Sequence, residues 1–202
     1  MQSDEIIHRG AFIEVKAIPF TIKDHKWQAK WEYVQRNNRP ELRSIDMVCI
    51  IPTFKENSNE ILVLTAMYRC SSEKIILSLP SGFVQDGDLV ENSLDILYRK
   101  TGYLGKSEDV TILGTPTHSD PWKSNETIQY VKIKINQSLE ENMGIRERDD
   151  SEMIKIETVP VHGLLESLFK LCQENDYLLD SRLYTLALGI EKKKCSNSNK
   201  IN

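Results

Sequence analysis

The sequence has few cysteines, few aromatic residues and no long apolar run. Its four cysteines, Cys49, Cys70, Cys172 and Cys195, are widely separated and form no C-x-x-C pair, which argues against a zinc site or a dithiol redox site. No window approaches the roughly 20 apolar residues of a membrane-spanning helix. The first ten residues also lack the basic and apolar segments of a secretory signal. We therefore expect an intracellular protein, cytoplasmic or nuclear, that does not enter a membrane.

Positive charge is also in short supply. The 26 lysines and arginines are outnumbered by 30 aspartates and glutamates, which gives a formal net charge of −4 and a pI near 5.7. This balance argues against a general nucleic-acid-binding surface. A length of 202 residues is enough for one sizeable core, but not for two large domains.

Alternating apolar residues predict strands in the N-terminal part of the chain. Ile13, Val15 and Ala17 alternate with polar neighbours, and Ile18 and Phe20 continue the alternation in the opposite phase. The polar residues 23–26 then predict a turn before a second strand that ends near residue 36. This part of the chain is therefore expected to form a hairpin.

The rest of the chain alternates between predicted strands and helices. Apolar or alternating runs predict strands at 45–54, 60–69, 74–79, 109–117, 126–135 and 151–161. Apolar positions at helical spacing predict helices that begin near residues 89, 164 and 179. This order is typical of an α+β fold in which helices flank a mixed β-sheet sandwich. We predict an N-terminal strand region at 1–40, a main domain at 41–192 and a disordered polar tail at 193–202.

The segment 79–103, LPSGFVQDGDLVENSLDILYRKTGY, resembles the Nudix box, G-x5-E-x7-R-E-U-x-E-E-x-G-U, in which U is a bulky apolar residue. Gly82 matches the opening glycine, and residues 101–103 match the close. The interior is one residue short, and a gap near Asp88 places residues 95–100 on R-E-U-x-E-E. Only the apolar position, Leu97, then agrees with the motif.

The resemblance implies Mg²⁺-dependent cleavage of a diphosphate, and Mg²⁺ requires oxygen ligands. In the family, glutamates on one face of the motif helix supply them, whereas the matching positions here are Ile96, Arg99 and Lys100. We therefore expect no metal cofactor, and Mg²⁺ only if some hydrolase activity remains. Two interpretations of the basic pair stay open. Arg99 and Lys100 bind an anion in place of the metals, or Arg99 forms an ion pair with Asp95 and the helix faces solvent or a partner.

Further segments resemble the ADP-sugar pyrophosphatase branch of the family, which cleaves ADP-ribose into AMP and ribose 5-phosphate. They are 31–36 (WEYVQR), 67–69 (MYR), 79–82 (LPSG), 119–127 (SDPWKSNET), 151–154 (SEMI) and 179–182 (LDSR). In that branch the N-terminal strands are exchanged between two subunits and contact the adenine base. A homodimer that binds an ADP-ribose-like nucleotide is therefore implied.

The resemblance also implies roles for single residues. Trp31 and Arg36 match base-contacting positions, Arg69 a diphosphate contact and Glu152 a late acidic residue near the attacking water. Asp120, Trp122 and Asn125 match the loop that shapes the sugar pocket, although Trp122 replaces a glycine and could close that pocket. Ordinary packing of Trp31 and a strand-end ion pair of Arg69 are equally simple interpretations. Asp86 and Asp88 are more typical of a turn or helix cap.

Three functional hypotheses follow. The first is a Nudix-fold pseudoenzyme that binds a nucleotide-like ligand or a protein partner without catalysis. The second is an active or altered hydrolase of nucleoside diphosphate sugars that uses Glu152, Asp86 or Asp88. The third is a structural dimeric subunit of a larger complex. The four histidines have no metal-binding spacing, although His118 lies one residue before the predicted sugar-pocket loop.

Overall fold

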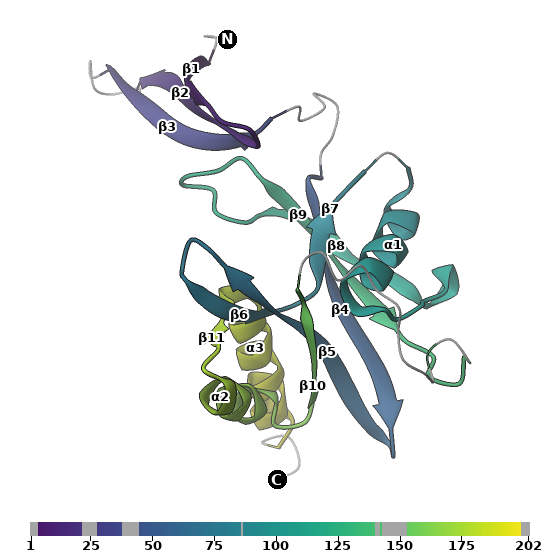
Figure 1. Ribbon diagram of the computed structural model, residues 1–202. Coiled ribbons are helices and arrows are strands. Elements are labelled where there is room, and N and C mark those ends of the chain that lie inside the picture. The colour runs from purple at the N-terminus through teal and green to yellow at the C-terminus, as the bar shows by residue number, and fades with distance from the viewer. Residues whose placement is uncertain are drawn as a thin grey trace. The chain divides into compact units, whose positions relative to one another are not determined.

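The computed structural model describes residues 4–21, 28–37, 45–85, 87–139, 142 and 153–198, without the side chains of residues 28 and 193–198. The chain divides into two compact units (Figure 1). The first contains Met1–Met47 and Gly114–Gln129, and the second contains Val48–Leu113 and Tyr130–Asn202. The predicted boundary near residue 40 lies outside the described residues, as does the predicted turn at 23–26.

The first unit contains a three-stranded antiparallel sheet, in the order β1-β2-β3. Its strands are β1 (Glu5–Arg9), β2 (Ile13–Thr21) and β3 (Gln28–Arg36). The predicted hairpin is formed by β2 and β3, in a register that places Ile18 opposite Trp31. β1 was not predicted, because its sequence EIIHR has no clear alternation.

The mixed sheet has the order β11-β6-β5-β4-β9-β8, with β10 paired to β5 and β7 paired to β4. Its strands are β4 (Met47–Glu56), β5 (Asn59–Arg69), β6 (Lys74–Ser78), β7 (Ser81–Phe83), β8 (Val110–His118), β9 (Thr127–Lys134), β10 (Lys155–Pro160) and β11 (Leu178–Leu179). β11 is parallel to β6, whereas β5 is antiparallel to β4, β6 and β10. Gly82, the opening glycine of the motif, lies within the short strand β7.

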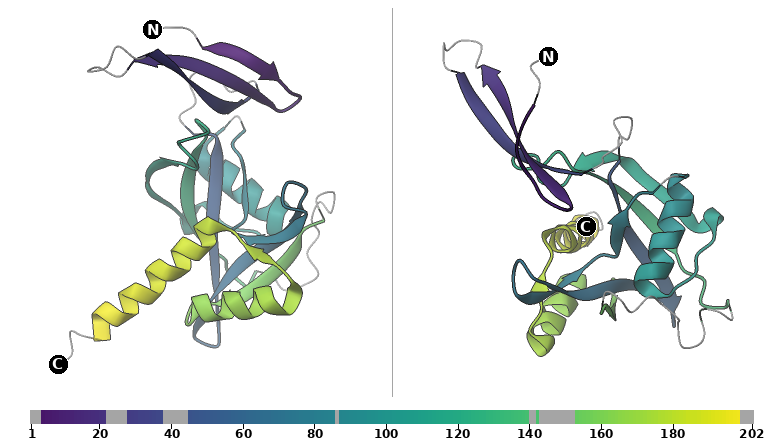
Figure 2. Two further views of the ribbon diagram at one scale, coloured as in Figure 1. Left: turned by 90° about the vertical axis from the view of Figure 1, so that its left-hand side faces the viewer. Right: turned by 45° about the horizontal axis from the view of Figure 1, so that its top comes forward.

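The described part of the second unit also contains the α-helices α1 (Leu89–Thr101), α2 (Leu164–Asn175) and α3 (Ser181–Ser198) and a short 3-10 helix at Ser107–Asp109. Within this unit, α1 lies on one side of the sheet, and α2 and α3 lie on the other (Figures 1 and 2). The predicted α+β architecture is therefore confirmed. α3 continues to Ser198, so helical backbone extends into the segment 193–202 that was predicted to be a disordered tail. In the described part of the chain, no helix meets the length and apolar content needed to span a membrane.

Local signals fix both ends of α1. The Asp88 carboxylate accepts a hydrogen bond from the backbone N–H of Val90, 3.0 Å away, which satisfies a donor that has no partner within the helix. At the other end, Gly102 has a φ of 72° and donates its N–H to the carbonyl of Tyr98. Glycine adopts this left-handed conformation without steric cost. The capping role predicted for Asp88 is confirmed.

One side of α1 is part of the hydrophobic core. Ile96 and Leu97 are fully buried, and they pack with side chains of β4, β5 and β9. The core members from those strands include Val48, Ile50, Val63, Val131 and Ile133. Burial of this apolar side holds the motif helix on the sheet.

Loss of the Asp88 cap should weaken α1 measurably. We expect Asp88→Ala to lower the free energy of unfolding by about 1 kcal/mol, because the Val90 N–H loses its acceptor. Asp88→Asn keeps a side-chain oxygen and should have a much smaller effect. Urea unfolding followed by circular dichroism measures both, and an equal loss in the two variants would contradict the cap.

Candidate functional site

The motif helix does not direct Ile96 into an open cleft. Ile96 is fully buried, and it packs directly on Gly82 of β7. A Cβ atom added to Gly82 would lie 3.0 Å from Ile96 Cγ1 and 3.2 Å from Ile96 Cγ2, closer than ordinary van der Waals contact. The opening glycine of the motif and the first substituted ligand position are therefore packed against each other.

Arg99 and Lys100 lie on the last turn of α1 and are only partly buried. The ion pair between Asp95 and Arg99, which was one of the two interpretations left open by the sequence, is present, with Arg99 Nη2 and Nε at 2.6 and 2.8 Å from Asp95 Oδ2. Much of the positive charge of Arg99 is thus already balanced on the helix itself. Both cations also lie near the helix C-terminus, where positive charge is favourable.

These three positions do not fit a magnesium site. Ile96 offers no donor atom, and the cationic groups of Arg99 and Lys100 have no lone pair for a hard divalent ion. Among the described residues, no group of three or more histidine, cysteine, aspartate or glutamate side chains could hold a metal ion. Asp86 and Glu152, the other predicted carboxylates, lie outside the described residues.

The first unit brings together β3 and the loop 119–126, both of which the sequence singled out. Arg36 Nε lies 3.1 Å from Glu126 Oε2, and Asn125 donates a hydrogen bond of 2.8 Å to the side chain of Gln35. The backbone N–H of Val34 donates to the carbonyl of Lys123 at 2.7 Å. Two predicted ligand contacts, Arg36 and Asn125, therefore also hold this loop on β3.

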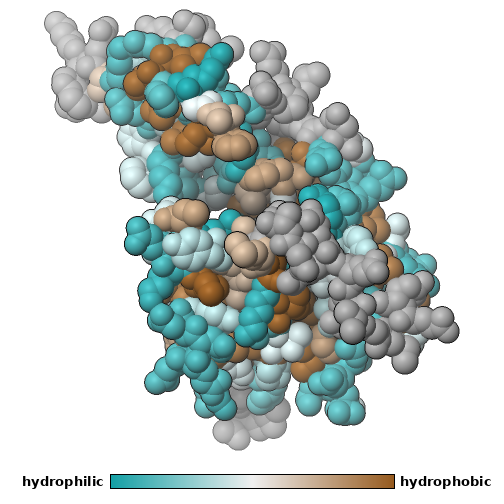
Figure 3. Space-filling view, viewed as in Figure 1, coloured by the Kyte–Doolittle hydropathy of each residue, from teal (hydrophilic) through white to brown (hydrophobic). Residues whose placement is uncertain are grey.

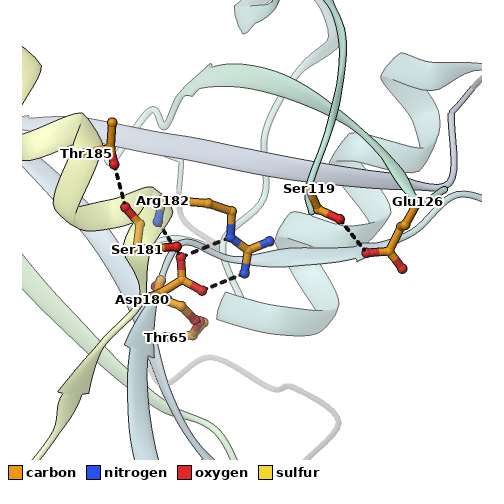
Figure 4. Close-up of polar contacts among 8 residues, drawn as sticks. Thr65, Ser119, Glu126, Asp180, Ser181, Arg182 and Thr185 are labelled. Carbon is orange, nitrogen blue, oxygen red and sulfur yellow. Dashed lines mark hydrogen bonds and ion pairs between the residues drawn. The ribbon is translucent and has the colours of Figure 1, made fainter. Parts of the chain in front are cut away.

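The loop has its own internal turn. Asp120 forms an ion pair of 2.6 Å with Lys123, and its carbonyl accepts hydrogen bonds from the N–H groups of Lys123 and Ser124. Ser119 donates to Glu126 at 3.4 Å (Figure 4). The carboxylate of Asp120 therefore stabilises the turn in which Trp122 lies.

Both candidate tryptophans are accessible. Trp31 is 46% exposed, and its ring meets Phe20 edge-on with the centroids 6.2 Å apart. Trp122 is 67% exposed, and the Lys123 ammonium lies 5.7 Å from its ring centroid. Neither ring is enclosed within its own unit, so each has a flat apolar surface available for contact.

Arg69 lies at the exposed end of β5, opposite Lys74 in the register with β6. Its carbonyl accepts hydrogen bonds from the Ser72 N–H and hydroxyl. Lys74 forms an ion pair of 2.6 Å with Asp176, so its charge at this end of the hairpin is balanced. His118, at the end of β8, is exposed.

A half-buried ion pair at the start of α3 was given no role from the sequence. Asp180 and Arg182 are joined by contacts of 2.6 and 2.9 Å (Figure 4). Burial opposes ionisation of Asp180, but hydrogen bonds and the charge of Arg182 outweigh it and hold the pKa of the carboxyl below its ordinary value. In the sequence, the segment LDSR at 179–182 contains both residues of this ion pair, but it indicated only a resemblance to a family.

Cys49 lies near this pair, and its thiol is buried. Burial raises the pKa of Cys49 to about 12, so the thiol stays protonated and unreactive near neutral pH. Burial also raises the pKa of Tyr130. Cys49, Cys70 and Cys172 are free cysteines, and Cys70 is the exposed one among them. This region therefore supports the fold without an activated nucleophile.

Comparisons with known proteins agree on the fold. No family model matches the chain. A Caenorhabditis elegans protein described as "Putative nudix hydrolase 2" is 26% identical over 192 residues, which cover 94% of this chain and 84% of that protein. The crystal structure of an ADP compounds hydrolase matches with a TM-score of 0.65 at 14% identity, over 98% of this chain and 95% of the other.

The contact between Gly82 and Ile96 predicts a specific packing defect. We expect Gly82→Ala to destabilise the protein by about 1–3 kcal/mol, because the new methyl group overlaps Ile96. Ile96→Ala should restore room for it, so the double variant should be more stable than the sum of the single effects predicts. Gly189→Ala, where an added Cβ meets nothing within 4 Å, is the control. If urea unfolding shows that the stability losses of Gly82→Ala and Ile96→Ala simply add in the double variant, this packing is contradicted.

The lowered pKa of Asp180 predicts a pH-dependent contribution to stability. Ionised Asp180 stabilises the fold above its unfolded pKa of about 3.9, and this stabilisation is lost as the pH falls through the lower folded pKa. Asp180→Asn should therefore cost about 1.5–3 kcal/mol at neutral pH and progressively less below about pH 4. Asp176→Asn, which removes an exposed ion pair with Lys74 instead of a half-buried one, is the matched control. A cost that does not change between neutral and acidic pH would argue against this role.

Proposed function

The predicted resemblance to Nudix hydrolases is confirmed by these similarities, and from it we propose that the chain binds an ADP-ribose-like nucleotide without hydrolysing it. The observation that carries this proposal is the burial of Ile96 against Gly82. A position that supplies a carboxylate in the resembled family is here part of the hydrophobic core.

Charge on the rest of the motif helix supports the same proposal. Arg99 is paired with Asp95, and Lys100 adds a second cation one residue further along. The turn presents two cationic groups and a carboxylate that is already paired with Arg99, so the electrostatic attraction needed to hold a divalent ion is missing. If one metal ligand is lost, a neighbouring carboxylate can replace it. Replacement of the residues at all three ligand positions, 96, 99 and 100, leaves the helix with no group to coordinate the ion.

Binding of a nucleotide is supported by the first unit. Trp31 offers an exposed indole face on β3, and stacking of a base on such a ring contributes about 1–3 kcal/mol. Arg36 lies on the same strand, and Asn125 and Asp120 lie on the loop attached to it. The matched crystal structure is that of an ADP compounds hydrolase, which makes an adenosine diphosphate derivative the first ligand to test.

We also propose that the chain is a homodimer that uses the strands of the first unit. Apolar side chains gather on this unit (Figure 3). Among the described residues of β1, β2, β3 and the turn between β1 and β2, the large exposed ones are Ile6, Ile7, Phe12, Ile13, Ile18 and Trp31. A three-stranded sheet with this much exposed apolar surface is typical of a protein-protein contact. Trp31 would then serve both the dimer and the ligand.

The first test is an assay of AMP release. The protein incubated with ADP-ribose and Mg²⁺ or Mn²⁺ should release no AMP above the rate without protein, because the motif helix offers no ligands for the ion. AMP release that Glu152→Gln abolishes would overturn the proposal and support an active hydrolase. Chromatography of the nucleotides measures the outcome.

The second test is binding. ADP-ribose should bind in isothermal titration, and Trp31→Ala should weaken it by about 1–3 kcal/mol through loss of stacking. Phe169→Ala, which removes another exposed aromatic ring on α2, is the matched control and should bind normally. Sedimentation measures the oligomeric state of each variant, so it shows whether weaker binding comes from loss of the base contact or from loss of the dimer. No heat at millimolar ADP-ribose or AMP would reject nucleotide binding and favour a protein partner or a structural subunit.

A further inference from the structure

A pocket of about 460 Å³ lies in the second unit, where β4 and β9 end. β4 contributes Thr53, Phe54 and Lys55, and the segment 134–138 forms the other wall, with Glu60 of β5 beside it. This volume is in the range of pockets that hold small organic molecules. None of the residues predicted for the nucleotide site lines it.

Hydrogen bonds fix the shape of this pocket. The N–H of Ile135 donates to the carbonyl of Thr53 at 2.7 Å, which ties the two walls together. The Asn136 side chain accepts from the N–H of Ser138 at 2.9 Å. Asn142, which is almost fully buried, donates to the Asn136 carbonyl at 2.9 Å and also pairs with the backbone of Leu104. The wall is therefore held in place before any ligand arrives.

The pocket combines an apolar floor with a positive rim. Phe54 and Ile135 are nearly fully buried members of the core, and they form the apolar part of the lining. Lys55 and Lys134 are exposed, and neither forms an ion pair with a carboxylate in the described part of the chain. Their ammonium groups are thus available to a negatively charged group.

The one carboxylate in the described lining is already balanced. Glu60 accepts a hydrogen bond of 2.9 Å from Lys132, and that bond holds the pKa of Glu60 below its ordinary value. Glu60 therefore remains ionised and offsets Lys132. Lys55 lies opposite Glu60 in the strand register and is also attracted to it. The described lining therefore has two lysines, Lys55 and Lys134, and one carboxylate, so its charge balance is positive.

We propose that this pocket binds a small organic anion, with a phosphate or carboxylate group between Lys55 and Lys134 and an apolar portion over Phe54 and Ile135. The hydroxyl of Ser138 and the amide of Gln137 add hydrogen-bond donors to the rim. The inference is independent of the proposed nucleotide function, because the two sets of residues do not overlap.

Phenyl phosphate is the probe for this site, and inorganic phosphate and benzyl alcohol test its two halves separately. Titrations followed by protein NMR should show saturable shifts at residues 53–55 and 134–138 with phenyl phosphate. Inorganic phosphate should bind more weakly, and benzyl alcohol should not saturate. A carboxylate probe, benzoate, distinguishes a general anion site from a phosphate site.

Charge removal tests the role of the lysines. The double variant Lys55→Gln and Lys134→Gln should bind phenyl phosphate about tenfold more weakly, which corresponds to about 1.4 kcal/mol. Lys170→Gln removes an exposed charge on α2 outside the pocket and should bind normally. The two single variants give intermediate affinities and replace the double variant if it fails to fold.

Three results would overturn the proposal. They are the absence of saturable shifts at millimolar phenyl phosphate, an equal loss of affinity in Lys170→Gln, and shifts centred on Arg69 or Arg99 instead of the pocket. Failure here leaves nucleotide binding untouched, because that is measured through Trp31. Likewise, if nucleotide binding fails, the NMR shifts that phenyl phosphate causes at residues 53–55 should be unchanged.

Discussion

The packing of Ile96 on Gly82 is the constraint on which the rest of the second unit depends. It joins the motif helix to β7, and β7 in turn pairs with β4 in the centre of the mixed sheet. A glycine is required on the strand because the isoleucine occupies the space of its missing side chain. The same contact stabilises the fold at the helical position where the proposed motif alignment would place a coordinating glutamate.

Much of the architecture follows from local sequence. The alternating and apolar runs correctly predict most of the strands, and Asp88 and Gly102 indicate where α1 begins and ends. The segments missed were short: β1 has no alternation, and β7 and β11 form because neighbouring strands offer hydrogen-bond partners. A three-residue strand next to a proline carries too little local signal for prediction. Its pairing is a property of the assembled sheet.

The candidate site was less predictable, for a physical reason. Motif matching treats positions 96, 99 and 100 as one face of a helix. The structure separates them, because an isoleucine gains free energy from burial whereas arginine and lysine keep their charges near water. The contacts of Arg36 with Glu126 and of Asn125 with Gln35 each join residues 90 positions apart. Such pairs depend on the tertiary fold, and no spacing rule within the sequence reveals them.

Asp180 has a further consequence for how the second unit opens. Its N–H donates to Leu77 of β6, its carbonyl accepts from Tyr184, and its carboxylate accepts from the N–H of Arg182. One residue therefore links the strand pair β6-β11 to the first turn of α3. Fraying of that turn releases the backbone bond to β6 as well, so amide protons of the two elements should exchange with solvent in one cooperative step. The start of α3 and the edge of the sheet would behave as one folding subunit, although they belong to different layers.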